Sequence, residues 1–307
     1  MTRIYLITGF LGSGKTSFLQ NILDSEKTKS GVLMNEFGSI SIDSSVIGRQ
    51  AMDMIELTNG SIFCSCLKDN FIESLRILLL KNLDSIYIES SGLADPANML
   101  AIIDLLKKQC KIDFNYEGSI CIVDGLHFMK EIDMMVSVEN QIRHSKIILI
   151  NKMDLISSKT AKEIKDKIRS INDKALIYEI THGKIDFELL KFSNVINTRI
   201  GETSNTTENR PKTIIIKLTD TNVELEDIIT ALNTLKEFCY RIKGFVTVKD
   251  ITYKIDTVNE KLDVIQYESK GLNDQTLVFI SKIGVGIISK ILASTKETLK
   301  DKIEIVS

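Results

Sequence analysis

Short apolar runs alternate with amphipathic segments through the first 190 or so residues. The runs are rich in isoleucine, valine and leucine and are bounded by polar turns, which is typical of buried strands. Between them, apolar residues recur at helical spacing, as Phe71, Leu75 and Leu78 do within the predicted helix 69–82. The pattern predicts strands at 4–8, in 31–38, in 55–60, in 83–92, at 119–124, at 146–150 and at 175–180. Strands that alternate with helices predict an α/β fold with a mostly parallel sheet flanked by helices, and a ligand site at the carboxyl ends of the strands.

The pattern changes near residue 193, where a polar stretch begins. Beyond that stretch the sequence predicts strands at 213–218, 244–248, 252–258, 261–267 and 276–281, and helices at 223–238 and 285–299. Several strands in succession predict an antiparallel sheet in a small α+β domain. We therefore predict a nucleotide-binding domain at 1–192, a linker at 193–211 and a second domain at 212–307, to which no chemistry is assigned.

Residues 9–16, which read GFLGSGKT, follow the first predicted strand and precede a predicted helix. This order is the context of a phosphate-binding loop, in which glycines let backbone N–H groups surround the phosphates at the positive end of the helix. We expect Lys15 to reach the outer phosphates and the Thr16 hydroxyl to bind Mg²⁺. Other expected phosphate contacts come from Gly12, Ser13, Gly14 and Ser17. A chance glycine-rich turn is the alternative.

Residues 151–154, Asn-Lys-Met-Asp, follow the buried run 146–150. A carboxylate in this place accepts two hydrogen bonds from N1–H and the 2-amino group of guanine, which adenine cannot donate. We expect Asp154 to select GTP over ATP, Lys152 to cover the base and Asn151 to brace the loop. Thr181 lies just after the predicted strand 175–180 and is a further candidate contact to the base.

Acidic residues and cysteines follow the other predicted strands. Glu89 is expected to assist Thr16 at Mg²⁺, and Gly92 to act as a hinge near the γ-phosphate. Glu36 and Asp43 are candidate metal-facing acids, or alternatively solvated loop carboxylates. Adjacent thiolates such as Cys64 and Cys66 bind soft or borderline divalent ions when other ligands complete the site, although free cysteine is also a common core residue.

Bulk composition narrows the classes of function. The net charge of −2 with 43% apolar residues gives no reason to expect nucleic acid or membrane as a partner. No apolar run reaches the ~20 residues of a bilayer span. Five cysteines without a disulfide pattern and a start without a signal-peptide pattern predict a cytoplasmic protein.

With these motifs in hand, the chain resembles the CobW-type family of P-loop GTPases, which is related to the metal-insertion GTPases of hydrogenase and urease maturation. The resemblance rests on residues 8–16, 35–38, 57–60, 89–96 and 151–154, and in the second domain on 241–244 and 277–280. It implies GTP hydrolysis coupled to delivery of zinc or cobalt to a client metalloprotein or cofactor pathway, and a nucleotide-dependent homodimer.

The sequence differs from the family at the residues expected to bind the transition metal. After the Asn-Gly turn the family has Gly-Cys-x-Cys-Cys, whereas here Ser61 follows Gly60 and only Cys64 and Cys66 remain. Ser39 stands where the family commonly has another glutamate. Two other functions therefore stay open: a metal-independent GTPase switch that acts on protein partners, and a P-loop small-molecule kinase or ATPase, against which residues 151–154 argue.

Overall fold

The computed structural model describes residues 1–25, 28–35, 53–57, 68–110, 112–186, 188–191, 211–220, 223–258, 261–267, 275–299 and 302–306. The chain divides into two compact units, Met1–Asn209 and Arg210–Ser307. Each unit has its own sheet and its own apolar core, so each is described by itself.

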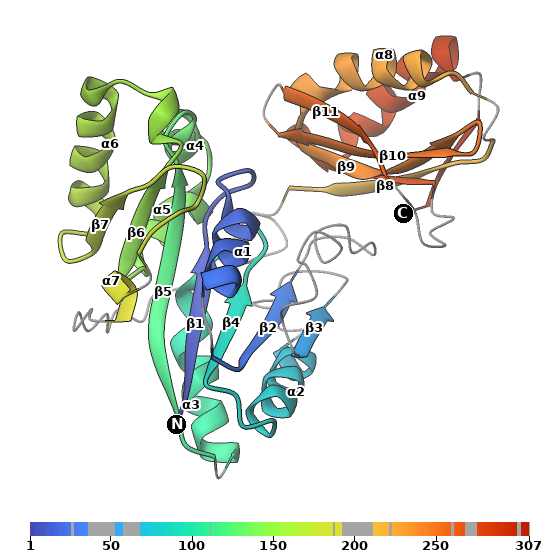
Figure 1. Cartoon of the computed structure of the whole chain (residues 1–307). Coiled ribbons are helices and arrows are strands. Elements are labelled where there is room, and N and C mark those ends of the chain that lie inside the picture. The colour runs from blue at the N-terminus through green and yellow to red at the C-terminus, as the bar shows by residue number, and fades with distance from the viewer. Residues whose placement is uncertain are drawn as a thin grey trace. The chain divides into compact units, whose positions relative to one another are not determined.

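The first unit is built on a seven-stranded sheet of the order β3-β2-β4-β1-β5-β6-β7, in which every strand pair of the described residues is parallel (Figure 1). Its strands are β1 (Thr2–Thr8), β2 (Ser30–Asn35), β3 (Asp53–Leu57), β4 (Ser85–Glu89), β5 (Phe114–Asp124), β6 (Ile147–Asn151) and β7 (Leu176–Glu179). Its helices are α1 (Lys15–Ser25), α2 (Lys68–Leu79), α3 (Met99–Gln109), α4 (Phe128–Met134), α5 (Val136–Arg143), α6 (Ser158–Ile171) and α7 (Glu188–Lys191), with short 3-10 turns η1 (Pro96–Asn98) and η2 (Met153–Leu155).

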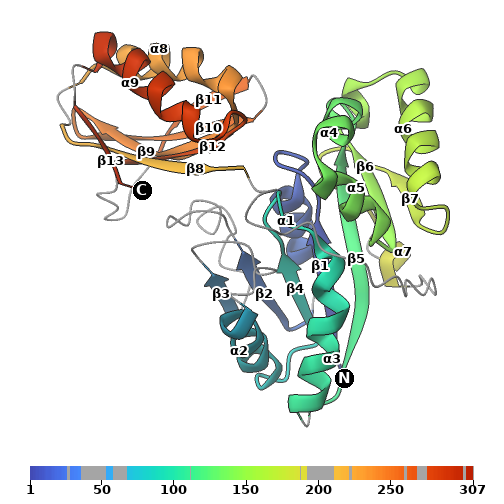
Figure 2. The ribbon, with the colours of Figure 1, turned by 180° about the vertical axis from the view of Figure 1, so that it is seen from behind.

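Alternation along β1 places apolar side chains on both faces of the sheet. Ile4 and Leu6 pack with α2 and α3, whereas Tyr5 and Ile7 pack with α1 on the opposite face. Figure 1 shows α1 in front of the sheet, and Figure 2 shows α3 in front when the view is reversed. A central strand buried on both faces is the expected consequence of a parallel sheet with crossover helices. The predicted fold class is confirmed.

The element bounds differ from the predictions where apolar periodicity is a poor guide. Helix α2 ends at Leu79 rather than at residue 82, where Asn82 has a left-handed φ of 50°. Pro96 begins the turn η1, capped by the Asp95 side chain at Ala97 N, and α3 follows it. Helix α4 was not predicted, because its seven residues are too few for a clear period and His127 provides no side-chain cap.

The second unit has a six-stranded antiparallel sheet of the order β11-β10-β9-β12-β8-β13, with α8 and α9 packed together on one face (Figure 1). Its elements are β8 (Thr213–Leu218), α8 (Leu225–Leu235), η3 (Lys236–Phe238), β9 (Cys239–Val248), β10 (Ile251–Val258), β11 (Lys261–Gln266), β12 (Thr276–Ser281), η4 (Gly284–Gly286), α9 (Ile287–Thr298) and β13 (Ile303–Ile305). The sequence predicted this architecture but missed β13 and the first residues of β9.

None of the helices in the described part of the chain combines the length and apolar character that a bilayer span requires.

Candidate functional site

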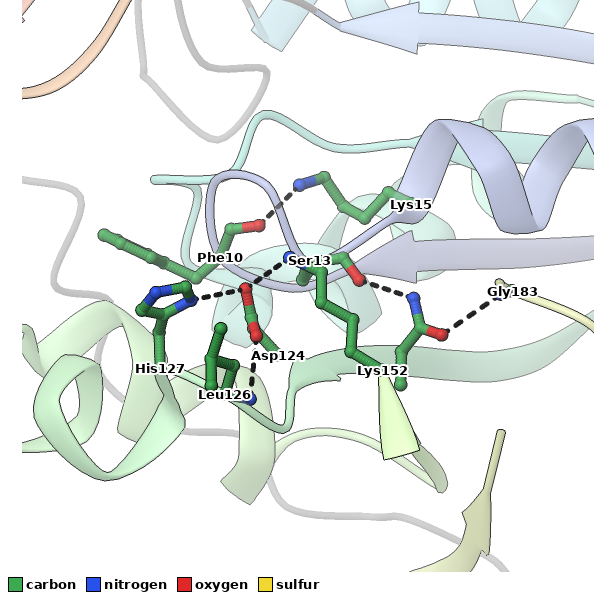
Figure 3. A network of polar contacts seen from close by, with 9 residues as sticks. Phe10, Ser13, Lys15, Asp124, Leu126, His127, Lys152 and Gly183 are labelled. Atoms are coloured by element: carbon green, nitrogen blue, oxygen red, sulfur yellow. Dashed lines mark hydrogen bonds and ion pairs between the residues drawn. The ribbon is translucent and has the colours of Figure 1, made fainter. Parts of the chain in front are cut away.

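The glycine-rich loop joins the central strand β1 to helix α1, whose first residue is Lys15. The Lys15 side chain is buried, and its Nζ donates a hydrogen bond to the Phe10 carbonyl at 2.9 Å (Figure 3). It also donates to the Gly9 carbonyl at 3.0 Å. The ammonium is thus held against its own loop by neutral acceptors. An anionic ligand offers a stronger acceptor to an ammonium than a carbonyl does.

Thr16 in α1 and Glu89 at the end of β4 contact each other. Thr16 Oγ1 lies 2.9 Å from Glu89 Oε1, and the Glu89 side chain is buried. A hydroxyl beside a carboxylate supplies the hard oxygen ligands that Mg²⁺ prefers. The pair therefore has the donor chemistry of a magnesium site next to the phosphate loop.

The segment after β4 lies directly against the phosphate loop. A Cβ atom on Gly92 would meet Leu11 N at 2.8 Å, so only glycine allows this approach. Helix α5 holds the segment from the other side, because Gln141 Nε2 donates to the carbonyls of Gly92 at 3.1 Å and Ala94 at 2.9 Å. Gly92 is therefore in contact with the phosphate loop and is also linked to α5 by a hydrogen bond.

Asn151, at the end of β6, joins two loops that are far apart in sequence. Its Nδ2 donates to the Ser13 carbonyl at 2.9 Å, and its Oδ1 accepts from Gly183 N at 3.1 Å (Figure 3). The approach is close enough that a Cβ on Gly14, whose φ is 102°, would lie 2.5 Å from Asn151 Nδ2. One buried side chain thus braces the phosphate loop and the loop after β7.

Lys152 adopts a left-handed backbone conformation with φ 63°, and its Nζ pairs with Asp124 Oδ2 at 2.7 Å. Asp124 ends β5, is buried, and also accepts from Leu126 N and lies 3.0 Å from His127 Nδ1 (Figure 3). Burial alone would raise the pKa of Asp124, but the hydrogen bonds of His127 and Lys152 outweigh it and hold the pKa below its usual value. Asp124 is therefore an ionised acid at neutral pH.

The other predicted contacts lie around the same edge of the sheet. Asp154 lies in η2 with its side chain exposed. Its carboxylate is therefore open to a bound base. Thr181 is half-buried and pairs with Lys184 in a β-bridge. Gly12, Thr16 and Lys152 are half-buried, Ser13 is buried and Ser17 is exposed.

Four of the predicted metal ligands, Glu36, Asp43, Cys64 and Cys66, lie outside the described residues. The remaining cysteines are packed into or against the cores. Burial raises the pKa of Cys121 to about 12 and that of Cys239 to about 12, so both stay protonated thiols at neutral pH. Cys110 is half-buried and packs against the core under α2 and α3.

Two polar residues of this region were not singled out from the sequence. Asp124 has the signal that identified Asn151, since it ends a buried strand at the carboxyl edge of a parallel sheet. Gln141 has no such signal, because its position is set by the packing of α5 against the Gly92 segment.

Replacing Asn151 by Ala should weaken nucleotide binding by roughly 10-fold, since two buried hydrogen bonds between loops are lost and their backbone partners are left unsatisfied. Fluorescent guanine nucleotide titrations of the variant and the parent protein would measure the effect.

Asn172 offers a matched control for this substitution. It is equally a buried asparagine that bridges backbone groups, with Nδ2 donating to Ile142 O and Ser145 O, but none of its partners belongs to the site. Asn172→Ala should lower the melting temperature and leave nucleotide affinity unchanged. Equal losses of affinity in the two variants would contradict a specific brace at Asn151.

Comparisons with known proteins bear on the family of this chain. A family model described as the CobW/HypB/UreG nucleotide-binding domain matches residues 3–179. The zinc chaperone YjiA of Escherichia coli (strain K12) is 34% identical over 199 residues, 62% of this chain and 61% of that protein. Zinc-regulated GTPase metalloprotein activator 1 of Schizosaccharomyces pombe is 34% identical over 204 residues, 60% of this chain and 46% of that protein.

Among solved structures, Zn(II)-bound YjiA GTPase from E. coli aligns over 97% of this chain and 98% of that one, with 22% identity and a TM-score of 0.47. In sequence, the chain spans about three fifths of the length of YjiA and less than half of the yeast protein.

Proposed function

Because the chain belongs to the CobW/HypB/UreG family of nucleotide-binding proteins, we propose that it hydrolyses GTP and couples hydrolysis to delivery of zinc or cobalt to a client protein or cofactor pathway. The observation that carries the proposal is the convergence of three groups at one edge of the sheet: the phosphate loop, the pair Thr16 and Glu89, and the loop at Asn151.

The phosphate loop fits a nucleoside triphosphate. The Ser13 hydroxyl is buried and makes no hydrogen bond to any residue that the structure describes, so it is a polar group that a bound ligand would satisfy. Lys15 exchanges the carbonyls of Gly9 and Phe10 for the β- and γ-phosphates. Gly12, Gly14 and Ser17 complete the cradle at the start of α1.

Hydrolysis requires position and charge more than covalent chemistry. Thr16 and Glu89 would hold Mg²⁺, with Glu36 or Asp43 as a further acid, and the ion would neutralise charge on the phosphates. Lys15 stabilises the charge that develops as water attacks the γ-phosphate in line. Gly92 touches the phosphate loop, so loss of the γ-phosphate is transmitted to α5 through Gln141.

Guanine selectivity comes from the loop after β6. Asp154 accepts from the base, the stem of Lys152 covers it, and Asn151 holds this loop to the phosphate loop. Thr181 adds a contact from the loop after β7, which Asn151 also holds.

Delivery of a metal is supported by the names of the curated relatives, of which YjiA is called a zinc chaperone. Cys64 and Cys66, with Glu36, supply ligands of the type that zinc and cobalt take. We place this activity in the cytoplasm, where thiols stay reduced. The partner is a client metalloprotein or cofactor-pathway protein, reached by the chain as a monomer or as a nucleotide-dependent homodimer.

Co²⁺ titration of the reduced protein should give thiolate-to-metal absorption that is strong with Mg²⁺ and a non-hydrolysable GTP analogue and weaker with GDP. The reason is that loss of the γ-phosphate is a switch event of the kind that changes affinity for a second ligand. Visible absorption spectra in the two nucleotide states measure the difference.

The Cys64→Ser, Cys66→Ser double variant is the control, and it should bind nucleotide normally without the thiolate band. If the parent protein binds guanine nucleotide but shows no thiolate band, the metal-independent GTPase switch would be the favoured function. A preference for ATP would instead favour the small-molecule kinase or ATPase.

A further inference from the structure

A second group of metal-binding side chains lies beside the site, separate from the cysteines. Asp124, His127 and Glu131 each offer one ligand atom, and these atoms all lie within 4.8 Å of one another. Asp124 ends β5, His127 precedes α4, and Glu131 is one helical turn further along. The Glu131 N–H donates to the His127 carbonyl at 3.0 Å, so the two side chains share one face of the helix.

Two of the three side chains in this group are buried carboxylates. The Asp124 side chain has no exposed surface and Glu131 is 5% exposed, so two carboxylates are taken out of water close together. Lys152 brings one positive charge, to Asp124 Oδ2. Nearby cations stabilise buried carboxylates, and a divalent ion held between Asp124 and Glu131 would add to that stabilisation.

We propose that Asp124, His127 and Glu131 bind one divalent transition-metal ion of the zinc class, which displaces the Lys152 ammonium from Asp124. The displacement follows from a shared atom, because Asp124 Oδ2 is both the acceptor of Lys152 Nζ at 2.7 Å and the oxygen nearest His127 Nδ1 at 3.0 Å. Both contacts fit this oxygen at once, but a divalent ion bound there would repel the Lys152 ammonium, and this repulsion favours its displacement.

One imidazole nitrogen and two carboxylate oxygens suit zinc, cobalt or nickel better than magnesium, which prefers oxygen ligands alone. Tetrahedral zinc places its ligand atoms roughly 3.3 Å apart. The Asp124 and His127 atoms, 3.0 Å apart, already lie near that spacing, and the separations of up to 4.8 Å would have to shorten by at most about 1.5 Å. The His127 side chain is 31% exposed and gives the ion access from solvent. Three protein ligands leave a position for water or for a ligand from a client, which suits a metal that is to be passed on.

Binding of the metal and binding of the nucleotide would then both depend on the position of Lys152. Displaced from Asp124, Lys152 is available to the base, so each ligand should tighten the binding of the other by the same factor. This coupling, unlike the metal site itself, rests on the proposed role of Lys152 at guanine.

The test is a Co²⁺ titration of nucleotide-free protein in the Cys64→Ser, Cys66→Ser background, followed by visible d–d absorption. We expect a single equivalent of Co²⁺ without a sulfur-to-metal band, displaced by Zn²⁺. Affinity should fall at least ~10-fold in His127→Asn and in Glu131→Gln, since a lost ligand costs no less than a lost outer-shell partner. Lys152→Met should raise the affinity about 3- to 10-fold, because the competing charge is gone.

Asp133→Asn is the matched control, since it removes an exposed carboxylate from the same helix, and it should leave Co²⁺ affinity unchanged. Glu131 is buried, so His127→Asn decides the result if Glu131→Gln fails to fold. Unchanged affinity in His127→Asn, or no gain in Lys152→Met, would overturn the proposal. If His127→Asn loses affinity and Lys152→Met gains it, but GDP leaves Co²⁺ affinity unaltered, the metal site is supported and the proposed role of Lys152 at guanine is wrong.

Discussion

Replacing Lys15 by Ala should abolish GTP hydrolysis, lowering kcat by about 10³-fold or more, because a preorganised charged donor is lost at the γ-phosphate. The ammonium is already held within the loop by the carbonyls of Gly9 and Phe10, so little reorganisation is needed before it meets the phosphates. Phosphate release under saturating GTP and Mg²⁺ would measure the loss.

Two further variants separate chemistry from folding. Lys15→Met keeps the apolar stem of this buried side chain and removes the charge together with the hydrogen bonds to the Gly9 and Phe10 carbonyls. It should lose hydrolysis while the protein stays folded, which a melting curve checks. Lys162→Ala removes a lysine from the exposed face of α6 and should hydrolyse GTP as the parent does. Hydrolysis retained in both Lys15 variants would refute the site.

Asp154→Asn should exchange guanine for xanthine as the preferred base. Guanine presents two donors to Asp154, whereas an asparagine amide turns its own donor towards the 2-amino group. The loss of charged hydrogen bonds should cost about 2–4 kcal/mol, or roughly 30- to 1000-fold in GDP affinity. Xanthine carries a carbonyl in place of the amino group, so xanthosine diphosphate should bind the variant more tightly than GDP does. Parallel titrations with both nucleotides measure the exchange.

The exposed position of Asp154 makes this substitution a clean one, since no described contact within the fold depends on it. Asp166→Asn, on the exposed surface of α6, is the control and should leave both affinities unchanged. Equal affinity of Asp154→Asn for GDP and xanthosine diphosphate would show that another residue reads the base.

Contiguous motifs made the first unit readable from its sequence. Residues 9–16 and 151–154 each have a local pattern that ties residue type to backbone geometry, and the structure places both at the carboxyl edge of the sheet, joined by Asn151. Family membership is confirmed by the match over residues 3–179. The assignments of individual site residues stay predictions, including those at Glu36, Asp43, Cys64 and Cys66.

What the sequence left hidden depends on contacts between distant segments. The contact between Lys152 and Asp124 forms because β5 lies next to β6 in the sheet. Strand β13 has three residues, too few for an alternating pattern, and is fixed by pairing with β8. The position of β1 between β4 and β5 has no local signal at all.

That central position of β1 also sets the order in which the first unit can assemble during translation. Arg3 of β1 pairs with Ser85 of β4, 82 residues later, so at typical rates of synthesis β1 waits roughly 4–16 s for its first neighbour in the sheet. The hydrogen bond that braces Ser13 waits longer, until Asn151 has been made. The phosphate loop is thus synthesised early, whereas the residue that braces it is synthesised late. Nucleotide binding would therefore stabilise only chains in which the sheet has formed as far as β6.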